Sequence, residues 1–140
     1  MYSKIWLSKP HFETDDLDYF KTTMESNWIS TVGPNIACFE RSIEDVFNKN
    51  LKAVALNSGT SAIHLALKML HIGAGDEVIC QTFTFCATVN PILYCGATPI
   101  FIESEQETWN MCPVFLEEAI KDRLKINKKP KAIIVVDSYG

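Results

Sequence analysis

The sequence has 140 residues, 47% of them hydrophobic, with 13 basic and 17 acidic side chains and a formal net charge of −4. This length and composition predict one globular domain. The acidic balance argues against a nucleic-acid partner, because such proteins normally present a basic face. No run reaches the roughly 18 apolar residues of a membrane span, and the first ten residues lack the apolar stretch of a secretory signal. We therefore expect no membrane partner and a cytoplasmic location.

The five cysteines and three histidines do not form a recognisable metal or disulfide pattern. The cysteine count is odd, and neither a C-x-x-C pair nor a Cys/His ligand spacing occurs. The expectation is reduced thiols, mostly buried, and no metal site.

The first part of the chain, residues 1–50, is predicted to be an extended arm followed by two helices. The arm covers residues 1–14. The first helix is capped by Asp15 or Asp16 and runs to about Asn27. A loop over 27–34 ends in a Gly-Pro turn signal. The second helix is predicted from apolar residues at helical spacing between Ile36 and Phe47.

From residue 51 onward, short apolar runs alternate with amphipathic ones. This order predicts strands over 52–56, 77–81, 98–103 and 132–137, and helices over 60–70, 85–94 (kinked or restarted at Pro91) and 113–123. Short links between them imply an α/β fold, a mostly parallel sheet with helices on both faces. Ligands of such sheets bind at the carboxyl ends of the strands. The segments expected there are 58–60, 82–85 and 137–140.

Two of these segments carry a chemical signal. Ser58-Gly59-Thr60 can place a tight turn and two hydroxyls at a helix N-terminus, where a phosphate is favoured; an ordinary helix cap is an equal alternative. The segment is neither a Walker loop nor a dinucleotide fingerprint. Phe85 can form a wall for a planar ring, or can simply pack in the core. Together, these segments suggest a phosphorylated heteroaromatic cofactor.

Six collinear segments add a family resemblance that covers essentially the whole chain. They resemble the DegT/DnrJ-type nucleotide-sugar aminotransferases, which are pyridoxal-phosphate enzymes of the aspartate-aminotransferase fold (fold type I). The segments are NWISTVGP (27–34), AVALNSGT (53–60), GDEVI (75–79), TFTF (82–85), NPILY (90–94) and ETWNM (107–111). The resemblance implies that residues 51–140 begin the pyridoxal-phosphate-binding large domain.

The resemblance also implies the cofactor-binding residues. Thr60, with the backbone N–H groups of Gly59 and Ser61, would hold the cofactor phosphate. Ser61 replaces the more common alanine. Phe85 matches the aromatic residue that stacks on the pyridine ring.

The loop from Trp28 to Pro34, including Ser30 and Thr31, matches the segment that lines the sugar-nucleotide site near a homodimer interface. Gln81 stands where many members have proline, and Cys112 where many have aspartate. Neither is expected to touch the chemistry.

By resemblance, the reaction moves an amino group from an amino acid, usually glutamate, to a keto sugar carried on a nucleotide, for cell-surface glycans. The family's Schiff-base lysine and the acidic partner of the pyridine nitrogen would both follow Gly140. Asp137 is not assigned as that acidic partner, because it lies one strand before the position that the family uses. We therefore expect an N-terminal fragment that is inactive alone. The alternatives are a sugar dehydratase on the same scaffold, or a non-catalytic α/β module that binds a phosphorylated ligand.

Overall fold

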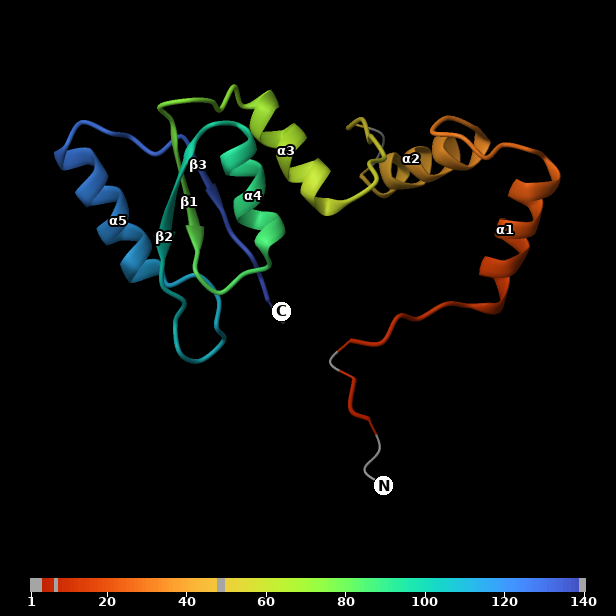
Figure 1. Ribbon diagram of the computed structural model, residues 1–140, viewed down its shortest axis with the longest axis horizontal. Helices are drawn as coiled ribbons and strands as arrows, with labels where there is room; N and C mark the ends of the chain where they lie inside the picture. Colours follow the sequence, from red (N-terminus) through yellow and green to blue (C-terminus); the bar gives the residue numbers. More distant parts are fainter. Residues whose placement is uncertain (1–3, 7, 48–49, 139–140) are drawn as a thin grey trace. The chain divides into compact units, whose positions relative to one another are not determined.

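The computed structural model describes residues 4–6, 8–47 and 50–138. Residues 1–3 and 7 of the expected arm, and 139–140 of the expected ligand rim, lie outside the described residues. The chain divides into two compact units, Met1–Ala55 and Leu56–Gly140. The elements, in chain order (Figure 1), are α1 (Thr14–Glu25), α2 (Pro34–Val46), α3 (Gly59–Met69), β1 (Glu77–Gln81), α4 (Cys86–Tyr94), β2 (Thr98–Ile102), α5 (Pro113–Lys125) and β3 (Ala132–Ile134).

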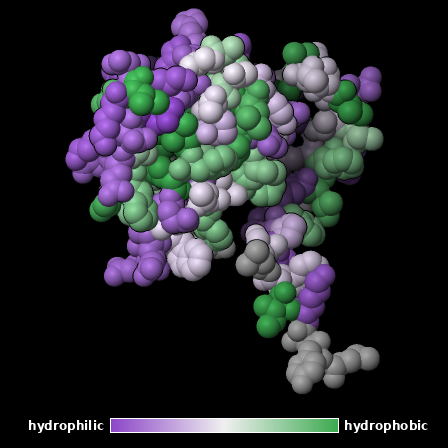
Figure 2. Space-filling view, turned by 60° about the vertical axis from the view of Figure 1, so that its left-hand side comes forward, coloured by the Kyte–Doolittle hydropathy of each residue, from purple (hydrophilic) through white to green (hydrophobic). Residues whose placement is uncertain are grey.

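The first unit contains the two expected helices. The N-cap of α1 is Glu13, so the expectation of Asp15 or Asp16 is wrong. Asp16 lies inside the first turn, where its carboxylate accepts a hydrogen bond from the Glu13 N–H at 2.9 Å. No residue of α1 or α2 is buried. Large apolar side chains of these helices, such as Leu17, Phe20 and Phe39, are therefore exposed. Figure 2 shows hydrophobic residues at the surface in green.

The strand predicted over 52–56 is not formed. A strand needs a neighbour for its backbone groups, and no described strand pairs with this segment. Two carboxylates of α2, one helical turn apart, replace that neighbour. Glu44 Oε1 accepts from the Ala53 N–H at 3.2 Å, and Glu40 Oε1 accepts from the Ala55 N–H at 2.9 Å. Hydrogen bonds from Ala53 and then Lys52 lower the pKa of Glu44.

The second unit has the predicted sheet. Its strands are parallel in the order β2-β1-β3, and Figure 1 shows α5 on one side of them and α3 and α4 on the other. Side chains of the central strand alternate accordingly: Val78 and Cys80 pack with residues of α3 and α4, whereas Ile79 packs with residues of α5. The prediction of a parallel sheet covered on both faces is confirmed.

Most element ends lie within one or two residues of the predictions, and two differences affect the site. α4 continues through Pro91 as one helix, so the alternative of a fresh start at Pro91 is wrong. β3 ends at Ile134, three residues before the predicted end. The early end of β3 opens the sheet beside the last residue of β1.

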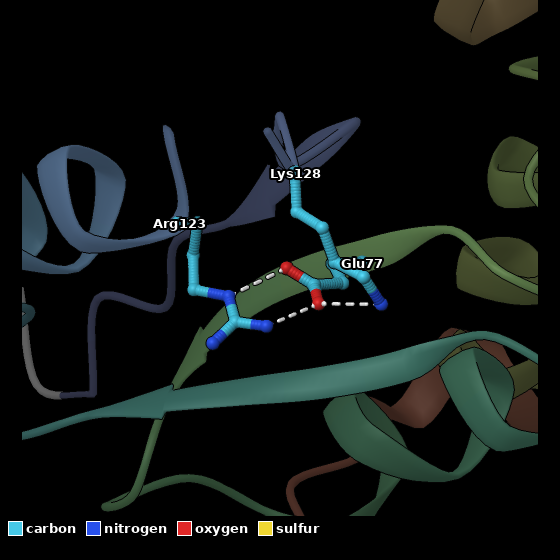
Figure 3. Close-up of polar contacts among 3 residues, drawn as sticks. All are labelled: Glu77, Arg123 and Lys128. Carbon is cyan, nitrogen blue, oxygen red and sulfur yellow. Dashed lines mark hydrogen bonds and ion pairs between the residues drawn. The ribbon is translucent and has the colours of Figure 1, made fainter. Parts of the chain in front are cut away.

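A buried ion pair joins the start of β1 to α5. Glu77 is only 4% exposed. Its two carboxylate oxygens accept from Arg123 Nε at 2.8 Å and from Arg123 Nη2 at 2.6 Å, while Lys128 Nζ lies 3.4 Å away (Figure 3). The Arg123 hydrogen bonds hold the pKa of Glu77 below its ordinary value. Bidentate hydrogen bonds between a guanidinium and a carboxylate are stronger than hydrogen bonds between neutral groups.

Candidate functional site

The N-terminus of α3 is ordered by a network of short polar side chains. Ser58 is the N-cap, and its hydroxyl accepts from the Ser61 N–H at 3.2 Å. The hydroxyls of Ser58 and Ser61 lie 3.1 Å apart, and Ser61 Oγ donates to Asn57 Oδ1 at 2.7 Å. The Ser61 N–H, expected to face a phosphate, is therefore already used by the cap.

Gly59 and Thr60 provide the polar groups at this helix terminus that are still available to a ligand. The first N–H groups of a helix have no partner within the helix, and the Thr60 hydroxyl makes no hydrogen bond to another described residue. Gly59 lies outside the left-handed region, so the expectation that it frees the backbone for a sharp turn is wrong. A Cβ atom at Gly59 would meet nothing within 4 Å. The open space beside a positive helix end fits a phosphate group.

Phe85 lies at the start of α4, directly beyond the carboxyl end of β1. It is the N-cap of this helix, and its side chain is 77% exposed, so it does not pack in the core. Beside it lies a cavity of about 430 Å³, lined by Thr82, Phe83, Thr84, Phe85, Val136, Asp137 and Ser138. An exposed aromatic ring at an open cavity has the geometry needed to stack on a flat ligand.

The helices that begin at these two segments pack against each other. His64 of α3 and Tyr94 of α4 meet edge to face, with ring centroids 5.7 Å apart. In Figure 1 both helices run upward, against the downward direction of β1. Their N-termini therefore point toward the end of the sheet at which ligands of parallel α/β folds bind.

The three expected substrate residues lie in the first unit. Trp28 is half exposed, and its ring lies over Gly33. Ser30 and Thr31 are exposed, and the Ser30 hydroxyl lies 3.5 Å from the Val32 N–H. The structure therefore places these residues on one solvent-facing loop.

Replacing Gly33 with alanine should displace Trp28. Gly33 has φ +148°, and an added Cβ would lie 3.3 Å from Trp28 Cε3. A side chain in this region of φ costs roughly 1–3 kcal/mol. The Trp28 indole N–H signal in a nuclear magnetic resonance spectrum should shift or broaden. Gly73→Ala is the control, because Gly73 has no positive φ and its nearest contact would be 3.9 Å; equal effects of the two changes would contradict the prediction.

Two residues that sequence reasoning did not select lie behind the cavity. Gln81 is fully buried and bonds to Phe83 and Val136. Asn110 Oδ1 accepts from the Ser138 N–H at 3.1 Å. Gln81 is not among the residues that line the cavity, but its hydrogen-bond partners Phe83 and Val136 both are. The expectation that Gln81 does not touch the chemistry stays a prediction.

Other classes of site find little support in the described part of the chain. It contains no group of three His, Cys, Asp or Glu side chains that could hold a metal, and none of its helices is long and apolar enough to cross a membrane. All five cysteines are free. Cys80 is buried, which raises its pKa to about 11. Cys95 and Cys112 are partly buried and Cys38 and Cys86 are exposed, so the expectation of mostly buried thiols is wrong.

The fold and the rim geometry define a class, the parallel α/β proteins that bind a ligand at the carboxyl ends of their strands. Within that class, the chain belongs to the DegT/DnrJ/EryC1/StrS aminotransferase family, whose sequence profile matches residues 10–140. The resemblance seen in the sequence is thereby confirmed.

Individual relatives agree with this assignment. EpsN of Bacillus subtilis (strain 168) is 46% identical over all of this chain and 36% of its own length. The GDP-perosamine synthase of Caulobacter vibrioides is 37% identical over 98% of this chain and 35% of its own length. A crystal structure of ntda from Bacillus subtilis with bound pyridoxamine phosphate has a TM-score of 0.74 and 31% identity, over 91% of this chain and 28% of its own. The chain spans about a third of the length of the curated relatives it matches.

Proposed function

We propose that this chain supplies two parts of the cofactor site of a pyridoxal-phosphate-dependent sugar aminotransferase: the residues that bind the phosphate group and the aromatic side chain that stacks on the pyridine ring. The observation that carries the proposal is the cavity beside exposed Phe85, in the same unit as the open terminus of α3. Gly59 and Thr60 would bind the phosphate, with the Ser61 N–H released from Ser58 if it takes part. Phe85 would stack on the ring.

The proposed reaction transfers an amino group from an amino acid, with glutamate as the expected donor, to a keto sugar nucleotide. Its support is family membership and the relatives named as GDP-perosamine synthases. The cofactor supplies an electron sink and carries the amino group between donor and acceptor. The chain's own residues bind and orient: the α3 terminus fixes the phosphate, and Phe85 fixes the plane of the ring.

The remaining parts of the proposal concern the surroundings of this site. The loop of Trp28, Ser30 and Thr31 would contact the sugar nucleotide, the protein would be a homodimer, and it would act in the cytoplasm in polysaccharide biosynthesis. The curated relatives include a spore coat polysaccharide biosynthesis protein, SpsC of Bacillus subtilis (strain 168), 42% identical over 84% of this chain and 30% of its own length.

Pyridoxamine phosphate is the probe that tests the site, because it lacks the aldehyde that would react with surface lysines. The purified chain should bind it reversibly, and Phe85→Ala should weaken binding about fivefold, since aromatic stacking contributes about 1 kcal/mol. The measurement is a fluorescence titration. Phe115→Ala is the matched control, because Phe115 is exposed on α5 and lines no part of this cavity. Absence of binding by the unchanged chain would overturn the proposal.

A further inference from the structure

The sheet opens beside the last residue of β1. On one side, β1 stays paired with β2 to its end, where Gln81 lies opposite Ile102. On the other side, the pairing with β3 stops one residue earlier, at Cys80 and Ile134. The two segments that leave this opening, 82–85 after β1 and 136–138 after β3, line the cavity beside Phe85.

The side chain of Gln81 bridges this opening. Its Nε2 donates to the Phe83 carbonyl oxygen at 2.9 Å, and its Oε1 accepts from the Val136 N–H at 3.3 Å. The orientation of the amide is fixed by this chemistry, because a carbonyl needs a donor and an N–H needs an acceptor. The side chain thus continues the link between β1 and β3 past the point at which their backbones separate.

A second amide holds the β3 side of the cavity from the loop after β2. Asn110 Oδ1 accepts from the Ser138 N–H, two residues beyond Val136. The backbone next to Asn110 is itself fixed, because the Asn110 carbonyl accepts from the Glu105 N–H at 2.9 Å. The segment after β3 is therefore attached at both 136 and 138.

We infer that Gln81, assisted by Asn110, is a positioning residue that holds the two walls of the Phe85 cavity at a fixed separation. This inference rests on the proposed function, because the ligand between the two walls is taken to be the cofactor ring. Gln81 does not itself line the cavity. It acts through the backbone of Phe83, two residues before the stacking ring, and through Val136 on the opposite wall.

The burial of Gln81 gives this bridge its strength. The residue is 0% exposed, so water cannot replace either of its hydrogen bonds. Removing the amide leaves a carbonyl and an N–H without partners at the edge of the core, which favours movement of the two loops toward water. If the two walls are correctly placed in only a fraction of the molecules, the apparent affinity for the ligand falls in proportion to that fraction.

The test replaces Gln81 with methionine, which has a similar length but no polar amide. Hydrogen exchange of the free chain should show the Val136 amide losing protection about tenfold, the scale of one lost hydrogen bond in the core. Pyridoxamine phosphate should bind about tenfold more weakly. Its induced circular dichroism per bound molecule should also fall, because a loosened ring has no single orientation.

Ile79→Leu is the control, because Ile79 is buried on the same face of β1 and packs with residues of α5. It should change none of these three quantities. If Gln81→Met does not fold, Asn110→Ala releases the same wall at Ser138 and should weaken binding in the same direction.

The outcomes separate this inference from the proposed function. Binding by the unchanged chain, with unchanged exchange and affinity in the folded Gln81 variant, would overturn the inference alone. Loss of protection without any change in affinity or dichroism would also overturn it. If the unchanged chain does not bind, the proposed function fails, and the exchange of Val136 alone decides whether Gln81 holds the two walls.

Discussion

Glu77→Ala should lower the free energy of unfolding by about 3 kcal/mol, the low end of the range for a buried ion pair that loses one partner. Glu77 is buried at the start of the central strand and binds both donor nitrogens of Arg123 that face it. Its loss leaves two cationic side chains, Arg123 and Lys128, directed at the same place without the carboxylate that they share (Figure 3). Arg123 retains some contact with solvent, which limits the loss.

The matched control is Glu117→Ala. Glu117 also forms an ion pair, with Lys121 one turn away on α5, but its side chain is 67% exposed. Exposed pairs of this kind contribute little, so this variant should unfold close to the unchanged chain. Urea unfolding followed by circular dichroism compares the three proteins. Equal losses in the two variants would show that the Arg123 pairing has no special effect.

The Glu77 pair should also set part of the acid sensitivity of the fold. The pKa of Glu77 is lower in the folded chain than its ordinary value of 4.5. Its contribution is therefore fully present above the unfolded pKa and is lost as the pH falls through the folded pKa. The difference in stability between the unchanged chain and Glu77→Ala should be constant near neutral pH and should shrink below about pH 4.5. A difference that grows in acid would contradict this assignment.

The elements that were predicted well are those whose burial can be read from local sequence. The run Glu77–Gln81 is buried at every position, and it is the strand that lies between two others with helices on both faces. α5 begins with proline at its first position, as the sequence indicates. In these segments, local preference and tertiary packing favour the same structure.

The errors arise where a distant residue decides the outcome. The apolar segment 52–56 has the composition of a strand, but its N–H groups bond to Glu40 and Glu44. Glu77 and Arg123 are 46 residues apart, and Gln81 and Val136 are 55 residues apart. No local pattern links such pairs, so the ion pair and the amide bridge could be recognised only once the sheet had brought their elements together.

The expected phosphate-binding segment carried an incorrect reason for its glycine, while phosphate binding there stays a prediction. Gly59 was expected to supply backbone freedom, yet it adopts no left-handed conformation. What the structure leaves at this position is space, because a Cβ atom would contact nothing. A glycine that the fold does not require is a sensitive place to test for a ligand.

Gly59→Asp should separate folding from cofactor binding. An acidic side chain in the first turn of α3 interacts favourably with the positive helix end, by about 0.5 kcal/mol, and finds open space. The chain should therefore unfold at the same urea concentration or a higher one. The same carboxylate would repel the phosphate of pyridoxamine phosphate at close range, and we expect binding to weaken about 100-fold.

Gly59→Asn is the matched variant, because asparagine has nearly the same shape without the charge. It should weaken binding far less than aspartate does, and the gap between the two should narrow as salt is added, since ions screen the repulsion. Equal losses in both variants would mean that the side chain blocks the site sterically and that no phosphate charge lies there. Unchanged affinity in both would place the phosphate away from α3, and the pairing of Gly59 and Thr60 with Phe85 in one site would have to be abandoned.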